Sequence, residues 1–262
     1  MDQQITINGH NLNVELSGSR NDPAILLLHH GLGAIRSWKD QISPLTTSGF
    51  FVVAYDRWGH GKSDPRLEYG MPYFHQDLVD LDALVEWLDL KQLAFVGHSD
   101  GGKIAMYYTL AHPEMVLALV LVSTHIYVEP KMEVGIQKIL QDYEQKSKFR
   151  EHMLSVHGQQ ADQLFYGWYH GWLNPANLTW DMRPEINAIS CPTLVIQGLE
   201  DEHATPQQAQ AIADTIPGAE LHLIPDTGHM LPQDSVETFN RLVIEFFTKH
   251  VKHPIHLGEL SE

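Results

Sequence analysis

The sequence predicts an α/β protein: a mainly parallel, doubly wound sheet with an antiparallel N-terminal hairpin and an inserted helical cap. Three observations support this fold class. Short runs of Val, Leu and Ile alternate with helical stretches, as in strands joined by crossover helices. Most of these runs are continuous, so both faces of each strand are expected to be buried. With 262 residues and 43% hydrophobic content, the chain is long enough for one large α/β domain.

The first element is expected to be a hairpin, because two alternating segments flank an Asn-Gly turn. Strands and helices then alternate along the core. The predicted strands are 4–8, 12–16, 24–29, 51–55, 93–96, 116–122, 193–197 and 220–224, and the predicted helices are 35–47, 73–88, 101–111, 205–216 and 235–248. In the second helix Asp77, Asp80 and Asp82 lie off the apolar stripe, so all three are expected to be solvated.

The alternation of strands and helices is interrupted once, between His125 and Pro192. The residues in between have a helical pattern and no predicted strand. We interpret residues 125–185 as a helical cap over one face of the sheet, with residues 1–124 and 186–262 forming the core.

The predicted cap is rich in aromatic residues, with 9 of the chain's 24. Aromatic side chains on helices often serve core packing, but a cap above the sheet must also present side chains to a site. Both roles stay open here. The candidates for an apolar substrate pocket with polar contacts are Tyr166, Trp168, Tyr169, His170 and Trp172.

Composition excludes several classes of function. The chain has 33 acidic and 17 basic residues, a formal net charge of -16, which disfavours binding to nucleic acid phosphates. The longest apolar run, Met115 to Val122, is far shorter than the ~20 residues that span a bilayer. The N-terminus lacks the pattern of a secretory signal, so a cytoplasmic protein is expected. The single cysteine, Cys191, excludes an intramolecular disulfide.

The strongest signal for chemistry is Gly97-His98-Ser99-Asp100-Gly101, between a predicted strand and a predicted helix. In that context a Gly-x-Ser-x-Gly string indicates a sharp turn that exposes the serine hydroxyl at the edge of the sheet. Glycines on both sides of the serine remove β-carbons that would block the turn. Because a serine hydroxyl is a weak nucleophile, it requires a nearby base that a carboxylate orients.

An acid and a histidine follow the last two predicted strands, which gives the chain order Ser99, Asp201, His229. With these motifs the chain resembles the α/β-hydrolase fold superfamily, serine esterase type, over essentially its whole length. The resemblance implies that Ser99 is the nucleophile, His229 the general base and Asp201 the acid that orients His229.

The resemblance also implies an oxyanion hole. Its two donors are the backbone N–H groups of Leu32, after the strand 24–29, and of Asp100. His29 is expected to be a core or strand-end residue. The segment 56–63 matches a family turn that we assign to maintenance of the fold.

An acid directly after the nucleophile is unusual for a generic esterase. The Ser-Asp-Gly-Gly string, the Leu-rich strands and the segment from Thr124 are similar to those of valacyclovir hydrolase-like α-amino-acid ester hydrolases, in which this acid pairs with the substrate ammonium. The resemblance therefore implies that Asp100 binds a substrate amine. The alternative is that Asp100 caps the following helix or bonds a nearby loop.

The sequence thus predicts a serine hydrolase that cleaves small carboxylic esters through an acyl-enzyme. A carbon–carbon bond hydrolase of meta-cleavage products is an alternative, but its dianionic substrates call for basic residues, and Arg36, Arg57 and Lys103 are not expected to point into the site. A lactonase or a non-catalytic ligand-binding receptor on the same fold are further alternatives.

No cofactor or metal is expected. His250, His253 and His256 recur at three-residue steps, but they lie in a polar tail and are expected to be solvated. The predicted partner is a small-molecule ester, with neither nucleic acid nor membrane. The oligomeric state is left open, a homodimer included.

Overall fold

The computed structural model describes residues 2–66, 69 and 73–251, and it confirms the predicted fold class. The strands are β1 (Asp2–Ile7), β2 (His10–Ser17), β3 (Ala24–Leu28), β4 (Phe51–Tyr55), β5 (Leu93–His98), β6 (Val116–Val122), β7 (Thr193–Gly198) and β8 (Glu220–Ile224). They form one sheet in the order β1-β2-β4-β3-β5-β6-β7-β8. β2 pairs antiparallel with β1 and β4, and the other neighbours are parallel. Asn8 and Gly9 in the hairpin turn have φ values of 50° and 87°, as the predicted tight turn requires.

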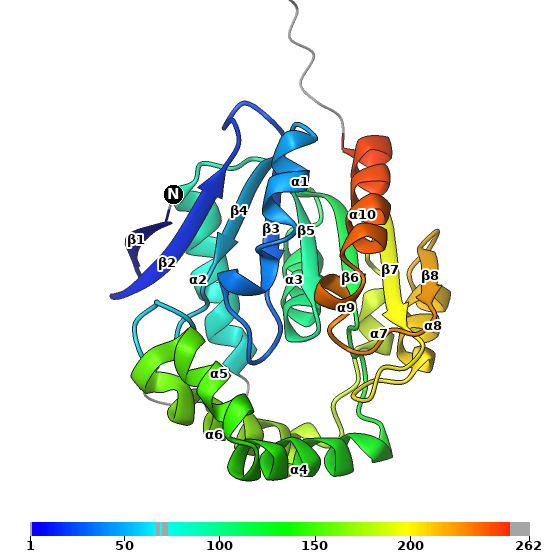
Figure 1. The fold of residues 1–262 in the computed structure, drawn as a ribbon. Helices are drawn as coiled ribbons and strands as arrows, with labels where there is room; N and C mark the ends of the chain where they lie inside the picture. The colour runs from blue at the N-terminus through cyan, green and yellow to red at the C-terminus, as the bar shows by residue number, and fades with distance from the viewer. Residues whose placement is uncertain (1, 67–68, 70–72, 252–262) are drawn as a thin grey trace, which may run out of the picture.

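Helices cover both faces of the sheet (Figure 1). One face carries α1 (Ile42–Thr47), α9 (Leu231–Asp234) and α10 (Val236–His250); the other carries α2 (Tyr73–Trp87), α3 (Asp100–Ala111) and α8 (Pro206–Thr215). The predicted helix 35–47 is two pieces, a 3-10 turn η1 (Ile35–Trp38) and α1. The predicted helix 235–248 corresponds to α10, and the short α9 precedes it.

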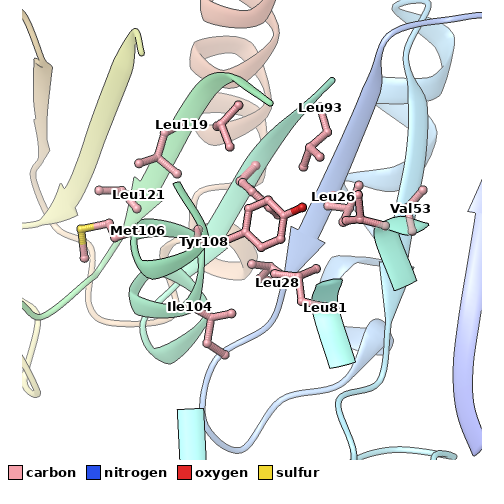
Figure 2. Packing of buried hydrophobic residues seen from close by; sticks show 14 of the residues in the cluster. Leu26, Leu28, Val53, Leu81, Leu93, Ile104, Met106, Tyr108, Leu119 and Leu121 are labelled. Atoms are coloured by element: carbon pink, nitrogen blue, oxygen red, sulfur yellow. The ribbon is translucent and has the colours of Figure 1, made fainter. Parts of the chain in front are cut away.

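The central strand β3 shows why both faces need helices. Leu26 and Leu28 pack in one apolar cluster, Ile25 and Leu27 pack in the other, and all four are fully buried. Figure 2 shows Leu26 and Leu28 close to Tyr108 of α3. Close packing on both faces leaves the carboxyl ends of β3 and β5 little freedom to move. The loops that follow these two strands are therefore held in place.

A helical segment connects β6 to β7 and lies across the carboxyl ends of the parallel strands (Figure 1). Phe165 stacks on Tyr143 with ring centroids 3.6 Å apart, so the segment has a small core of its own. It occupies the part of the chain for which a cap is predicted. Its elements are α4 (Pro130–Gln145), α5 (Ser147–His157), η2 (Gly158–Gln160), α6 (Ala161–Trp172), η3 (Pro175–Asn177) and α7 (Arg183–Ile186).

The expectation that the acids of α2 are solvated is wrong for two of them. Asp77 is 1% exposed and lies 3.3 Å from both Arg57 and Arg66, whose guanidinium groups are also buried. Asp80 is buried against side chains of the β1–β2 hairpin, and only Asp82 is exposed. An apolar period identifies the face that packs, but it does not reveal that another element brings polar partners to the remaining face. The pairing of Arg57 with Asp77 supports the assignment of the segment 56–63 to fold maintenance.

Two observations bear on membranes and metals. Within the described ranges, no helix has the length and apolar character that crossing a bilayer requires. The same part of the chain holds no group of His, Cys, Asp and Glu side chains placed to bind a metal ion. His250 lies 3.7 Å from Glu220, while His253 and His256 fall outside the described residues.

Candidate active site

Ser99 lies on the turn between β5 and α3, with φ 54° and ψ −114°. Such a conformation is strained for a residue with a side chain, and strain of this kind concentrates at functional sites. A β-carbon on Gly101 would lie 2.0 Å from the carbonyl oxygen of Leu28, and one on Gly97 would lie 2.5 Å from Cα of Gly102. Both glycines are therefore needed for the turn to pack against β3 and α3. The turn holds Ser99 at the carboxyl edge of the sheet, where open α/β sheets bind ligands.

Asp201 and His229 meet beside this edge. His229 Nδ1 lies 2.9 Å from Asp201 Oδ2, and both side chains are buried. The backbone N–H groups of His203 and Ala204 donate to Asp201 Oδ1, and Gln197 Nε2 donates to Oδ2. Burial acts to raise the pKa of Asp201, but His229 and the two backbone donors hold that pKa well below its usual range. The carboxylate is ionised, so His229 donates from Nδ1 and its Nε2 stays available as a base.

His98 links the loop that carries His229 to the serine turn, a role that sequence reasoning missed. Its Nε2 lies 2.9 Å from the backbone carbonyl oxygen of His229, and because a carbonyl only accepts, that nitrogen carries a proton. Burial, with a smaller effect of His229, lowers the pKa of His98 to about 3, so the ring is neutral at physiological pH. Since His98 directly precedes Ser99, this hydrogen bond fixes the His229 loop against the serine turn. The position of His98 directly before Ser99 was a signal in the sequence, but its hydrogen-bond partner, His229, is 131 residues away.

The two segments predicted to supply oxyanion donors lie close together. A β-carbon on Gly31, next to Leu32, would lie 2.5 Å from Asp100 Oδ2 and 2.4 Å from Trp168 Nε1. His157 of α5 contacts the same loop, with Nε2 3.1 Å from the carbonyl oxygen of Leu32. The Leu32 loop is thus held between α3 and the cap helices. Asp100 is the first residue of α3, where backbone N–H groups point away from the helix.

The Asp100 side chain is already paired within the chain. Lys103 Nζ lies 2.6 Å from Asp100 Oδ1, and both residues are 1% exposed. Burial acts to raise the pKa of Asp100, but Lys103 brings it below its usual value, so the pair is ionic. Ser99, not Asp100, is the N-cap residue of α3, so the predicted alternative of a helix cap is wrong. The expectation that Lys103 does not point into the site is also wrong, since Lys103 lines the cavity beside it, whereas Arg57 is buried against Asp77.

A cavity of about 310 Å³ lies beyond this ion pair. Trp172 connects it to the candidate site, because its ring lies 5.5 Å from that of His125, which is 5.9 Å from that of His229. The cavity is mostly apolar, with the ammonium-bearing Lys103 on its wall. Its lining residues are Phe74, His75, Leu78, Lys103, Tyr107, Val128, Gly171, Trp172, Asn177 and Trp180.

The five cap residues proposed as substrate contacts divide between the faces of α6. Trp172 lines the cavity, and Trp168, one turn earlier, lies against Gly31. Tyr166 and His170 are exposed, and the Tyr166 hydroxyl lies 3.5 Å from Glu144, so these two point away from the cavity. Tyr169 is half-buried beside His170. Residues four apart share a helix face, which puts Trp168 with Trp172 and Tyr166 with His170.

Comparisons with known proteins identify the family of the fold. The family model described as alpha/beta hydrolase fold matches residues 23–180. The serine hydrolase BPHL of Mus musculus is 27% identical over 251 residues, covering 93% of this chain and 85% of the relative. The 2-hydroxy-6-oxo-6-phenylhexa-2,4-dienoate hydrolase of Burkholderia cepacia is 26% identical over 266 residues, covering 90% and 91%.

A solved structure gives the same fold. The enol-lactonase from Burkholderia xenovorans LB400 superposes with a TM-score of 0.77, covering 94% of this chain and 100% of the enol-lactonase, at 23% identity. The shared architecture, the strained serine turn and the family match lead to one assignment. The chain is a hydrolase that belongs to the alpha/beta hydrolase fold family.

Proposed function

We propose that the protein hydrolyses small carboxylic esters through an acyl-enzyme on Ser99. His229 Nε2 takes the proton of the serine hydroxyl as the oxygen attacks the ester carbonyl, and Asp201 stabilises the imidazolium. The N–H groups of Leu32 and Asp100 bind the oxyanion of the tetrahedral intermediate. His229 then protonates the leaving alcohol, and a water that it deprotonates attacks the acyl carbonyl. The acid leaves and the Ser99 hydroxyl is regenerated.

The observation that carries this proposal is the junction of the strained Ser99 turn with the Asp201–His229 pair. These elements come from chain positions more than 100 residues apart, and the His98 bond to the His229 carbonyl ties them together. A ligand-binding receptor has no need of strain at Ser99 or of a buried, ionised carboxylate on the base. The arrangement fits catalysis better than passive binding.

The serine's role is testable by covalent labelling. We expect a fluorophosphonate probe to label the wild-type protein at one site and Ser99→Ala not at all, because only an activated hydroxyl attacks phosphorus. Ser43, an exposed serine of α1, provides the matched control, and Ser43→Ala should label like wild type. Mass spectrometry of the intact protein measures the adduct. Equal labelling of Ser99→Ala would exclude Ser99 as the nucleophile.

The His98 tether makes a separate prediction. His98→Leu leaves the buried carbonyl of His229 without its donor, so we expect a loss of about 1–3 kcal/mol in the free energy of unfolding. A displaced base should also lower kcat by about tenfold, which corresponds to about 1.4 kcal/mol of barrier, with little change in KM. His98→Gln retains an N–H donor and should recover part of both losses. Urea unfolding and ester kinetics measure them, and an unchanged kcat in His98→Leu would show that the tether does not position the base.

A second candidate is hydrolysis of a carbon–carbon bond in a dienoate, the activity in the name of the Burkholderia cepacia relative. One observation favours it: Lys103 is buried on the cavity wall and is able to face a substrate carboxylate. The charge of Lys103 is balanced by Asp100, so Lys103 attracts a dianionic substrate less strongly than an unpaired Lys or Arg side chain would. Comparing kcat/KM for p-nitrophenyl acetate and for 2-hydroxy-6-oxo-6-phenylhexa-2,4-dienoate separates the candidates. A clear preference for the dienoate would favour the second.

A further inference from the structure

The ammonium of Lys103 lies in surroundings typical of a bound cation. Its Nζ is 2.6 Å from the Asp100 carboxylate and lies over three aromatic rings, at 4.1 Å from the centroid of Trp172, 4.8 Å from Phe74 and 5.1 Å from Trp180. A carboxylate combined with several ring faces is the arrangement by which proteins recognise ammonium ions. We call Asp100, Phe74, Trp172 and Trp180 the cation cage.

We propose that Lys103 is a specificity-determining residue: it fills the cation cage with the chain's own ammonium, and so makes the enzyme reject ester substrates that carry an ammonium in the acyl group. This inference rests on the proposed ester hydrolysis and defines its substrate class as esters of uncharged or anionic acids. It departs from the expectation that Asp100 binds a substrate amine.

The position of the cage supports this assignment. Asp100 directly follows Ser99, and its Oδ2 lies 2.5 Å from the place of a β-carbon on Gly31, so the carboxylate borders the loop of the predicted Leu32 oxyanion donor. Lys103 is one turn further along α3, at the i+3 spacing that lets the two side chains meet, and both are fully buried. Lys103, Trp172, Phe74 and Trp180 all line the same mostly apolar cavity.

Electrostatic interactions with Lys103 determine which acyl groups the cavity favours. With Lys103 present, the carboxylate is neutralised, and a second ammonium brought to the cavity meets a like charge, while the described lining residues include no carboxylate. An uncharged acyl chain of the same shape brings no like charge to Lys103 and packs against the mostly apolar lining. An acyl carboxylate meets the Lys103 ammonium, which is attractive.

The wild-type protein provides the first test. Matched esters that exchange a terminal methyl for ammonium, hexanoyl against 5-aminopentanoyl and pentanoyl against 4-aminobutanoyl, differ in charge but hardly in shape. Alkylammonium groups stay charged at pH 7.5, because their ordinary pKa is about 10.4. We expect kcat/KM to favour the uncharged member by about 100-fold or more. Equal kcat/KM within each pair would overturn the proposal, even if ester hydrolysis itself is confirmed.

A second test examines the cage without catalysis. Lys103→Ala removes the fragment that n-propylammonium replaces, atom for atom. We expect n-propylammonium chloride to raise the Tm of Lys103→Ala by several degrees in a saturable manner, and 1-propanol or sodium chloride to have no such effect. The double variant Lys103→Ala/Asp100→Asn lacks the counter-charge and should show no rescue, and neither should wild type.

The proposed role of Lys103 also predicts that its substitution changes the substrate selectivity. Lys103→Met removes the charge at similar length and should shift the ratio of each ester pair toward the ammonium member by at least tenfold, whereas Lys103→Met/Asp100→Asn should not. If a single variant does not fold alone, folding on addition of n-propylammonium but not 1-propanol supports the cage. An equal response to both additives, or none in a folded variant, contradicts it. Failure of labelling at Ser99 would refute the proposed function independently, since the Tm measurement needs no turnover.

Discussion

Asp201→Asn should lower kcat by about four orders of magnitude with little change in KM. Asp201 is buried, and its carboxylate is surrounded by donors: His229 Nδ1, Gln197 Nε2 and two backbone N–H groups. An amide has one acceptor oxygen, so its NH₂ group must face at least one of these donors or take the place of the acceptor for His229. The imidazole then loses the partner that keeps its proton on Nδ1, and Nε2 is no longer a base. Steady-state ester kinetics measures the effect.

Glu202 supplies a matched control for that experiment. It is the next carboxylate in the same loop, its side chain is 58% exposed, and its Oε2 accepts the backbone N–H of His229 at 3.3 Å. Glu202→Gln keeps this acceptor and leaves the imidazole partner in place, so we expect a loss of less than about tenfold. If the kcat of Glu202→Gln fell as far as that of Asp201→Asn, the loss would reflect the position of the loop or the overall charge, not the orientation of the base.

Much of the fold could be predicted because its signals are local. The strands β4, β6 and β8 begin and end where their apolar runs predict, and Asn8-Gly9 marks the hairpin turn. The serine turn is also local, since Gly97 and Gly101 are required by contacts within a single strand-turn-helix unit and its neighbouring strand. Asp201 could be selected by its place after a strand end, a position that the sheet topology brings beside His229.

Other features were unpredictable because they depend on contacts between distant segments. The partners of Asp77 come from a preceding loop, and the partner of His98 lies on the last turn before α9. Lys103 was visible one turn after Asp100, but the aromatic rings that make its burial tolerable come from α2 and from the cap. The periodicity of a single sequence shows on which face of a helix or strand a polar residue lies. It does not show which group from elsewhere will meet it.

Buried neutral histidines lead to the last prediction, a steep loss of stability on acidification. Burial lowers the pKa of His98 and of His125 to about 3 and that of His157 to about 4. His157 shows why protonation is resisted: its Nδ1 accepts the N–H of Gly61 at 2.8 Å and its Nε2 contacts the carbonyl of Leu32. The neutral ring satisfies both partners, whereas a second proton on Nδ1 opposes the Gly61 donor.

The sign follows from proton linkage. Each of these folded-state pKa values lies below the unfolded value of about 6.5. At pH values between the folded-state and the unfolded-state pKa, the unfolded chain therefore binds more protons than the folded one. Their stabilisation is complete above about pH 6.5 and is lost as the pH falls toward the folded pKa. At pH 5 each histidine lowers the free energy of unfolding by about 2 kcal/mol, and the three together lower it by about 6 kcal/mol. This loss is comparable to the whole stability of a typical domain. We expect the free energy of unfolding in urea to fall by at least this amount between pH 7.5 and pH 5, because burial also lowers the pKa values of His29, His30 and His60.

His157→Asn should isolate one of these protons. Asn keeps an oxygen that can accept from Gly61 but does not titrate, so the dependence of stability on pH between 4 and 6.5 should decrease by about 1.4 kcal/mol per pH unit, whatever the absolute stability of the variant. A slope identical to wild type would contradict the assignment of a neutral, buried His157. A change of less than about 2 kcal/mol in wild type from pH 7.5 to pH 5 would contradict the larger claim.

Two other charge effects do not reverse this expectation. The net charge of -16 becomes smaller in magnitude as the pH falls, which relieves repulsion in the folded state, but exposed charges are screened over ~8 Å at physiological salt. The lowered pKa of Asp201 contributes stability that is present above about pH 3.9 and is lost only as the pH falls through its folded value. Between pH 5 and 6.5 the buried histidines therefore dominate. Because His98 and His157 hold the His229 loop and the Leu32 loop, the candidate active site should lose its geometry in the transition that unfolds the protein.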